Sequence, residues 1–360
     1  PATPHAAPAA NENANKDPPT SGNVTAGLHS GMVVEDSHVL SNEDNYNYTF
    51  NNASMNVLKR DVTISFNAND KPYDGNTEAT RNGDFIIDGV VSGDDVRAFG
   101  TALTYAFDAA TVLRDADGNV LARTVTADGD LVTLGKDIEN YNITFDNTTE
   151  ATITPLELTV TANSQHMIYG NDNPDLDGQY KVEGLLDIDT LDVTLDYDYD
   201  NIPTSDAGHF EAGEHDGAVI EAGHTLTNAE SYDYTFVAAD LTVLKRAITV
   251  VADDKTMTYG DDVPAFTYTF NEDDLADGDV IQVALGLDIA AGYKTDAGNV
   301  KAGEYGDVIT AAATVYDGEG NAVTGNYEIT YEFGDLTVGL RSITVTAQDQ
   351  EGAQGAGRVR

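Results

Sequence analysis

The chain has 360 residues, of which 41% are apolar, with 62 acidic and 18 basic side chains and a net charge of −44. This apolar content allows buried cores, while so acidic a surface excludes nucleic acid and anionic lipid as direct partners, since both need basic residues. The chain has no cysteine, which excludes disulfides, thiol catalysis and cysteine-ligated zinc. It also has no apolar run of about 18 residues, so the sequence predicts no membrane insertion.

One short pattern occurs four times. Its copies are residues 45–50 (NYNYTF), 140–145 (NYNITF), 231–236 (SYDYTF) and 326–331 (NYEITY). Their leading tyrosines are 95, 91 and 95 residues apart, a period typical of small tandem domains. Aromatic or branched residues alternate with polar ones, which predicts a strand with one buried face in each copy.

Six segments follow from this period. Residues 1–20 are rich in Pro, Ala and Asn and are expected to be a flexible tail. Residues 21–60 are expected to be the back half of a repeat, because 26–60 align without a gap on 212–246. The later segments are repeat 1 (61–156), repeat 2 (157–246), repeat 3 (247–341), and an opening strand with a C-terminal tail (342–360).

Each complete repeat reads as short strands between Gly, Asp and Asn turns. A hairpin with a glycine turn is predicted in repeat 1, where 111–114 and 120–123 flank 115–119. The only helical candidates are Val182–Leu191 and Glu272–Val283, both interrupted by glycine. We therefore predict a mostly β protein: an elongated string of tandem domains with at most one short helix per unit.

The motifs resemble the MBG and YDG repeats of large bacterial surface adhesins. In repeat 1 the opening strand is followed by Tyr73-Asp74-Gly75, and in repeats 2 and 3 by Tyr169-Gly170 and Tyr259-Gly260. The closing segments 240–243 and 335–338 (both DLTV) fit the same pattern. The resemblance covers roughly residues 21–350 and implies secreted or cell-surface stalks built of β-grasp-like or immunoglobulin-like sandwich modules, without catalysis.

Calcium is the cofactor that the acidic turns suggest, although none is required by the fold. Several carboxylate and amide oxygens fall within two short loops, as calcium needs. The candidate ligands are Asp115, Asp117, Asn119, Asp172, Asp175 and Asp177. Ordinary turn formation explains the same residues, and we favour that interpretation.

Histidines and tyrosines are the other candidates for metal ligands or binding platforms. His29 and His38 align with His215 and His224 and could form a metal pair, but repeats 1 and 3 lack them, which favours surface histidines. The repeated tyrosines could stack on carbohydrate, but their strand positions favour core packing. No catalytic motif is present, so we predict that the chain is not an enzyme.

The two ends suggest how the protein acts. A half repeat without an opening strand exposes a sheet edge, and residues 342–350 provide such a strand. The predicted insertion strand is Ile343, Thr344, Val345, Thr346 and Ala347, and the predicted acceptor edge is Met32, Val33, Val34, Tyr46, Tyr48, Phe50 and Val57. Head-to-tail contacts of this kind build filaments.

We therefore expect a secreted structural subunit of an extracellular filament, with a second copy of itself as partner. The alternative is a stalk segment of a surface adhesin whose ligand-binding tip lies elsewhere. A third hypothesis is an accessory module of an enzyme, which an exposed aromatic cluster on one repeat would favour, whereas bare polar faces would favour the first two.

Overall fold

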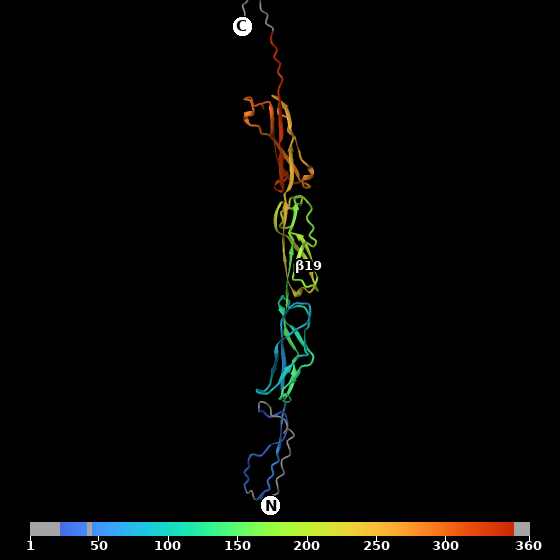
Figure 1. Ribbon diagram of the computed structural model, residues 1–360, viewed down its shortest axis with the longest axis vertical. Helices are drawn as coiled ribbons and strands as arrows, with labels where there is room; N and C mark the ends of the chain where they lie inside the picture. The colour runs from blue at the N-terminus through green and yellow to red at the C-terminus, as the bar shows by residue number, and fades with distance from the viewer. Residues whose placement is uncertain (1–21, 42–44, 349–360) are drawn as a thin grey trace, which may run out of the picture. The chain divides into compact units, whose positions relative to one another are not determined.

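The computed structural model describes residues 22–41 and 45–348 (Figure 1). The expected tail at 1–20, residues 42–44 within the half repeat, and the C-terminal residues 349–360 lie outside the described residues. The chain forms two compact units. Unit 1 contains the described residues up to Thr159 with Glu183–Leu191 and Leu226–Thr235, and unit 2 contains Val160–Val182, Asp192–Thr225 and the described residues from Phe236 on.

The described residues form β-strands joined by turns, as predicted. The strands before repeat 2 are β1 (Gly27–Val33), β2 (Ala53–Val57), β3 (Arg60–Ala68), β4 (Lys71–Pro72), β5 (Arg81–Asp88), β6 (Arg97–Phe99), β7 (Thr104–Phe107), β8 (Leu113–Arg114), β9 (Val120–Leu121), β10 (Arg123–Asp128), β11 (Val132–Leu134), β12 (Tyr141–Phe145), β13 (Thr148–Ala151) and β14 (Ile153–Thr154). The strands from repeat 2 on are β15 (Leu156–Ala162), β16 (Gln165–Ile168), β17 (Tyr180–Glu183), β18 (Leu191–Tyr197), β19 (Gly213–Leu226), β20 (Tyr232–Val237), β21 (Ala239–Leu244), β22 (Arg246–Ala252), β23 (Lys255–Thr258), β24 (Tyr268–Thr269), β25 (Val280–Leu287), β26 (Gly303–Tyr316), β27 (Tyr327–Glu332) and β28 (Gly334–Gly339).

In unit 1, the opening strand of repeat 1 lies at the centre of its sheet. The strand order is β12-β3-β5, with β3 parallel to β12 and antiparallel to β5. Val62, Ile64 and Phe66 on β3 are buried, whereas their neighbours in sequence are more exposed. This period of two is what a strand with one core face requires. The predicted hairpin is confirmed, because β8 pairs antiparallel with β9.

In unit 2, repeat 3 has the same plan in two sheets, of order β24-β22-β27 and β23-β28-β26-β25. The opening strand β22 again runs parallel to the tyrosine strand, here β27, and β23 runs parallel to β28. Contacts between β22 and β26 bring the two sheets together (yellow to red in Figure 1). The part of repeat 2 that lies in unit 2 shows the matching arrangement, with β21 parallel to β16 and antiparallel to β19.

A bulge recurs at one place in the repeats. The pairing register shifts between His29 and Val33, between His215 and Val219, and between Tyr305 and Ile309. The bulges contain Gly31, Gly217 and Asp307, all with positive φ. An extra residue with positive φ lets the strand bend without breaking its pairing on either side.

The two predicted helical segments are not helices. Residues 182–191 run from the end of β17 through turns to the start of β18. Residues 272–283 form one 3-10 turn (Glu272–Asp274), further turns and the first residues of β25. The described residues contain no α-helix, and each complete repeat has a 3-10 turn directly before its tyrosine strand, at Ile138–Asn140, Ala229–Ser231 and Thr324–Asn326.

Hydrophobic cores extend across the repeat boundaries. In unit 1, one cluster joins Phe66, Tyr73 and Phe107 of repeat 1 with Leu158 and Tyr232 of repeat 2. In unit 2, a cluster joins residues of repeat 2 (Tyr169, Phe210 and Leu241 among them) with residues of repeat 3 that include Ile248 and Tyr327. Each pair of successive repeats therefore shares apolar packing, which stabilises the boundary by burying surface there.

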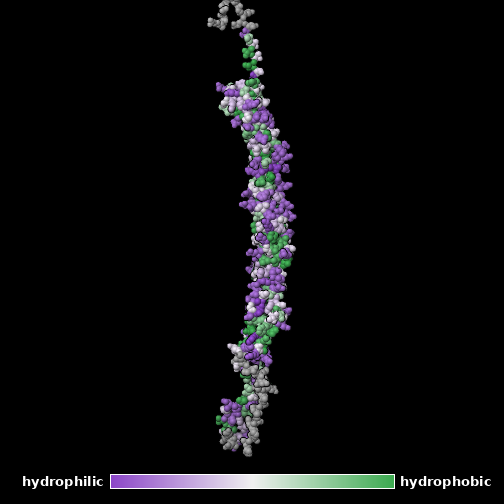
Figure 2. Space-filling view, in the orientation of Figure 1, coloured by the Kyte–Doolittle hydropathy of each residue, from purple (hydrophilic) through white to green (hydrophobic). Residues whose placement is uncertain are grey.

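Hydrophilic residues cover much of the visible face, in line with the net charge of −44 (Figure 2). Apolar residues show on the segment that follows repeat 3 (Figure 2). Within the described part of the chain, no helix has the length and apolar character needed to cross a membrane.

Candidate functional site

The tyrosine strand of the half repeat is exposed, unlike its three counterparts. Tyr46 is 65% exposed, whereas Tyr141 and Tyr327 are each 4% exposed. Tyr48 and Phe50 are exposed as well, and no strand is assigned to residues 46–50. In the complete repeats this segment is a strand paired with the opening strand. The half repeat thus presents aromatic side chains that belong to a core elsewhere in the chain.

The other predicted acceptor residues lie on or beside the pair β1–β2. Met32 and Val33 are the last residues of β1, and Val34 follows it; all three side chains are exposed. Val57 ends β2 opposite Gly27 and is half-buried. These residues and the exposed aromatic side chains lie in the predicted half repeat.

The predicted insertion strand is exposed along its whole length. Ile343 and Val345 are 83% and 86% exposed, whereas their counterparts Ile248 and Val250 in repeat 3 are 2% and 0% exposed. Thr344, Thr346 and Ala347 are exposed too, and no strand is assigned to residues 341–348. Complete burial of one such aliphatic side chain contributes about 1.5–3 kcal/mol. The free segment therefore carries apolar surface that pairing would bury.

The complete repeats define how an opening strand and a tyrosine strand pair. In repeat 3, Arg246 lies opposite Tyr327, and Ile248 lies opposite Ile329. Repeat 1 has the same parallel register, with Arg60 opposite Tyr141. Applied to residues 341–345 and 46–50, this register would place Arg341 opposite Tyr46, Ile343 opposite Tyr48 and Val345 opposite Phe50.

A buried carboxylate joins repeat 1 to repeat 2 in unit 1. Asp189 Oδ2 accepts hydrogen bonds from the hydroxyls of Tyr73 (3.0 Å) and Tyr232 (2.7 Å), and Asn228 donates to Oδ1 at 2.7 Å. The backbone N–H of Leu186 donates to the Tyr232 hydroxyl at 3.2 Å. The phenol of repeat 1 and the phenol of repeat 2 thus share one carboxylate.

Burial and hydrogen bonding shift the acidities of these groups. Burial, and then the hydrogen bond to Asp189, raise the pKa of Tyr232 to about 12. Burial disfavours the charged form of Asp189, but the donors around it, with Tyr232 foremost, outweigh burial and lower the pKa of the carboxyl group. The site therefore holds an ionised aspartate between two neutral phenols at neutral pH.

Unit 2 contains the same arrangement between repeats 2 and 3. Asp279 Oδ2 accepts hydrogen bonds from Tyr169 (3.1 Å) and Tyr327 (2.7 Å), and the Ala276 N–H donates to the Tyr327 hydroxyl at 3.0 Å. The two rings meet edge to face with centroids 5.5 Å apart. Burial raises the pKa of both phenols. We call this arrangement of one aspartate and two tyrosines the Asp–Tyr clamp.

A second bond recurs at every boundary. The side chain before each leading tyrosine accepts a hydrogen bond from a backbone N–H of the preceding repeat. The pairs are Ala26 to Asn140 (2.7 Å), Val112 to Ser231 (3.1 Å) and Ala212 to Asn326 (2.9 Å). The half repeat therefore meets repeat 1 in the way that complete repeats meet their successors.

The glycine after the clamp tyrosine is needed for close approach. Gly170 has a φ of +77°, and a Cβ there would lie 2.3 Å from the Ala276 Cβ. Gly75 also has a φ of +77°, and its Cβ would lie 1.9 Å from Ile188. A side chain at position 170 would push Ala276 away, whereas at position 75 only the end of the Ile188 side chain would have to move. The positive φ disfavours any side chain at both positions, as the Tyr-Gly and Tyr-Asp-Gly motifs require.

Hydrogen bonds within the turns account for the first candidate calcium loop. Asp115 Oδ1 accepts from the backbone N–H groups of Asp117 (3.0 Å) and Asn119 (2.8 Å), and the Asn119 amide donates to Oδ2 at 3.0 Å. The bond from the Asn119 side chain contributes most to lowering the pKa of Asp115. Asp317 forms the same turn in repeat 3 with Asn321.

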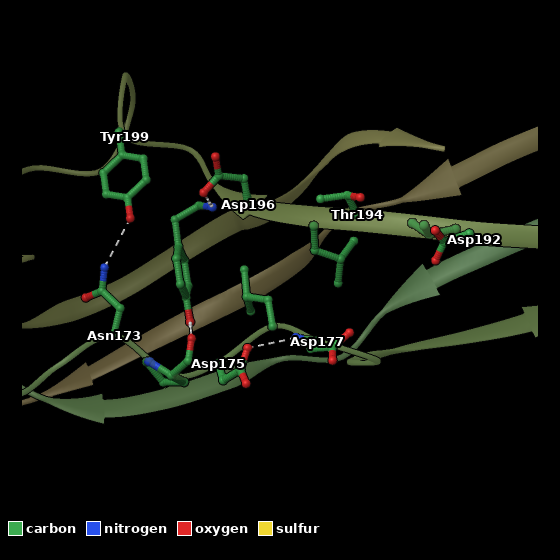
Figure 3. Close-up of a pocket in the computed structure, with 12 residues that line it drawn as sticks. Asn173, Asp175, Asp177, Asp192, Thr194, Asp196 and Tyr199 are labelled. Atoms are coloured by element: carbon green, nitrogen blue, oxygen red, sulfur yellow. Dashed lines mark hydrogen bonds between the residues drawn. The ribbon is translucent and has the colours of Figure 1, made fainter. Parts of the chain in front are cut away.

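The second candidate loop lines a shallow pocket beside β18 (Figure 3). Asp172 precedes the pocket-lining residues, and the labelled Asp175 and Asp177 lie on the loop itself (Figure 3). Asp175 Oδ1 accepts from the Asp177 N–H at 3.1 Å, and the Tyr197 hydroxyl donates to the Pro174 carbonyl at 3.0 Å. Among residues 22–41 and 45–348, no group of three or more His, Asp or Glu side chains could hold a metal ion.

The aligned histidines make aligned contacts. His29 and His215 bond through Nε2 to backbone carbonyls four residues earlier, at 2.7 Å and 2.8 Å. His38 and His224 each contact a glutamate three residues earlier at 2.5 Å. The prediction of surface histidines was wrong for His29, which is 5% exposed because it packs against β2 through the β1 pairing.

The Asp–Tyr clamp was not predicted from the sequence. An aspartate stands three residues after Val91, Leu186 and Ala276, at 94, 189 and 279. This repeated spacing was the available signal, but the residues around it (SGD, DID and DGD) are ordinary turn formers.

Residues 158–242 and 248–337 match the family model of the MBG domain of the YGX type. Repeats 2 and 3 are MBG domains. MBG domains are a structural, non-catalytic domain type that occurs in surface and extracellular proteins. The match confirms the predicted resemblance for these two repeats. The Tyr-Gly pair of the first MBG domain, Tyr169-Gly170, is the pair that enters the clamp with Asp279. A search of the curated proteins found no match to the chain.

Proposed function

We propose that the chain is a structural subunit of an extracellular filament that polymerises head to tail. Residues 342–347 of one subunit insert as the opening strand of the half repeat of the next subunit. The proposal is supported by side chains that are exposed here but buried at the equivalent positions of complete repeats. Ile343 and Val345 are 83% and 86% exposed, and Tyr46 is 65% exposed. The two exposed segments are the two partners of one parallel strand pair.

The composition is suited to such a role. MBG domains occur in surface and extracellular proteins, and a cysteine-free chain needs no oxidising machinery to fold. Subunits with a charge of −44 repel one another at low ionic strength, so salt should promote their association. No cation is required by the proposal, and calcium binding at the acidic turns remains a secondary hypothesis.

Sedimentation velocity and negative-stain electron microscopy of the purified chain test the proposal. The chain should form polymers, and Ile343→Asp should abolish them, since a charge would then enter a core position. Ser342→Asp is the matched control, because its counterpart Ala247 is exposed in repeat 3. Deletion of residues 342–360 should also leave monomers.

A monomeric chain under all ionic conditions would reject polymerisation by strand insertion. It would favour the alternative, a stalk segment of an adhesin in which neighbouring repeats of a longer chain cover both exposed segments. Equal loss of polymers in Ile343→Asp and Ser342→Asp would also reject the proposed register.

A further inference from the structure

A cavity lies between the half repeat and repeat 1, within unit 1. Its volume is about 340 Å³. It is lined by Asn23, Val24, Ala26, Val57, Leu58, Arg60, Val91, Asp94, Asn140 and Tyr141. Asp94 and Tyr141 are bonded to each other, with the phenol donating to Oδ2 at 2.6 Å. The cavity thus contains one aspartate and one tyrosine of a clamp.

The boundary between repeats 2 and 3 has equivalent residues at these positions, and there Tyr169 lies among them. The equivalent pairs are Ala26 and Ala212, Val57 and Val243, Leu58 and Leu244, Arg60 and Arg246, Val91 and Ala276, Asp94 and Asp279, Asn140 and Asn326, and Tyr141 and Tyr327. Tyr169 is completely buried, and its hydroxyl donates to Asp279. The cavity is therefore the position of a clamp tyrosine.

Backbone contacts hold Tyr169 as well. Its N–H donates to the Leu244 carbonyl at 2.9 Å, and Arg246 donates to the Tyr169 carbonyl at 3.4 Å. Leu58 and Arg60 are the equivalents of these two residues at the cavity. The cavity can therefore bind a strand end by its backbone and also accept one side chain.

The spacing along the chain identifies the occupant. The motif tyrosine follows a buried residue of the opening strand by 11 positions in each complete repeat: Val62 to Tyr73, Leu158 to Tyr169 and Ile248 to Tyr259. Tyr73 and Tyr169 are the ones that enter a clamp. The residue 11 positions after Ile343 is Gln354. Gly355 follows Gln354, as Gly170 follows Tyr169. The C-terminal segment thus carries Gln-Gly where the MBG domains carry Tyr-Gly.

We propose that this cavity binds Gln354-Gly355 of a second copy of the chain. The inference rests on the proposed strand insertion and extends it, because the inserted segment then runs from Arg341 to Gly355. The Gln354 amide donates to the Asp94 carboxylate, as a phenol does in the complete clamps. Gly355 lies against Val91, where a side chain would not fit.

Peptide binding to the full chain tests both proposals separately. The acceptor is the complete chain with Ile343→Asp, which cannot donate its own strand. The probes are fluorescent peptides of residues 341–349 and 341–360, measured by anisotropy. The longer peptide should bind at least tenfold more tightly, since a hydrogen bond to a charged acceptor adds about that much affinity.

Substitutions locate the effect in the cavity. In the longer peptide, Gln354→Ala and Gly355→Val should each remove the advantage, and Gln354→Tyr should increase it by restoring the second phenol of the clamp. Asp94→Asn in the acceptor should reduce binding of the Gln354→Tyr peptide more than binding of the shorter peptide.

The outcomes distinguish the two proposals. If both peptides bind equally well, strand insertion holds and the cavity proposal is overturned. If neither peptide binds, strand insertion fails and the cavity proposal fails with it. A Gln354→Tyr gain that persists in the Asp94→Asn acceptor would also overturn the cavity proposal.

Discussion

Removing hydroxyls from the Asp–Tyr clamp of unit 2 should destabilise the protein in a coupled way. Tyr327→Phe removes the donor to Asp279 and the acceptor of the Ala276 N–H. A hydrogen bond to a charged group contributes about 1.5–3 kcal/mol, and a buried N–H without a partner costs about 1–3 kcal/mol. The expected loss for this variant is therefore about 2.5–6 kcal/mol.

Tyr169→Phe removes only one donor to Asp279, so about 1.5–3 kcal/mol should be lost. Oδ1 of Asp279 is buried and has no hydrogen-bond partner among the described residues. The double variant thus leaves the buried carboxylate without either phenol, and its loss should exceed the sum of the two single losses by about 0.5–3 kcal/mol.

Scanning calorimetry of the complete chain measures the stability changes, and hydrogen exchange of the Ala276 amide reports the clamp directly. Tyr199→Phe is the control, because this tyrosine is largely exposed and should change stability by less than about 0.5 kcal/mol. If Tyr327→Phe changes the unfolding transition no more than Tyr199→Phe does, and Ala276 exchange stays slow, the clamp does not stabilise the boundary.

Four further outcomes are expected. The pKa of Tyr232 is raised to about 12 in the folded protein. Tyr232 therefore contributes about 2.7 kcal/mol to the free energy of unfolding below about pH 10, and this contribution is lost as the pH rises to 12. Tyr232→Phe should flatten this alkaline profile. The pKa of Asp189 is lowered in the folded protein. Its contribution to the free energy of unfolding is therefore present above the ordinary carboxyl pKa of ~3.9 and is lost as the pH falls through the lower folded value. In calorimetry, Asp189→Asn should not show this acid-dependent loss. Gly170→Ala should cost more than Gly178→Ala, although both have positive φ, because only Gly170 has a neighbour within 4 Å; equal melting temperatures would argue against close packing there. Asp115→Ala should lower the melting temperature by loss of its turn bonds, equally with and without a calcium chelator, and a loss that disappears with the chelator would show a bound ion instead.

Local patterns predicted the strands well. The alternation of Val62 and Ile64 with polar residues predicted β3, and the glycine turn at Gly118 predicted the β8–β9 hairpin. These features depend on residues close together in sequence, where side-chain period and turn chemistry decide the structure.

Other features depended on contacts between distant residues. Asp189 meets Tyr73 across 116 positions, and nothing around Asp189 distinguishes it from a solvated turn residue. The helical candidate at 272–283 was wrong because Ile281, Val283 and Leu285 alternate inward on β25, and pairing with β26 fixes them as a strand. Tertiary pairing overrides a weak helical pattern in such short segments.

The parallel pairing of β22 with β27 and of β23 with β28 determines how repeat 3 responds to tension. A pull on both ends of this repeat draws β23 backward and β28 forward, so the two strands must slide past each other. Sliding loads all of their hydrogen bonds at once, whereas peeling would break them one by one. Resistance to forced unfolding depends on the height of that barrier, so this pairing should let repeat 3 bear a stretching force applied at its two ends.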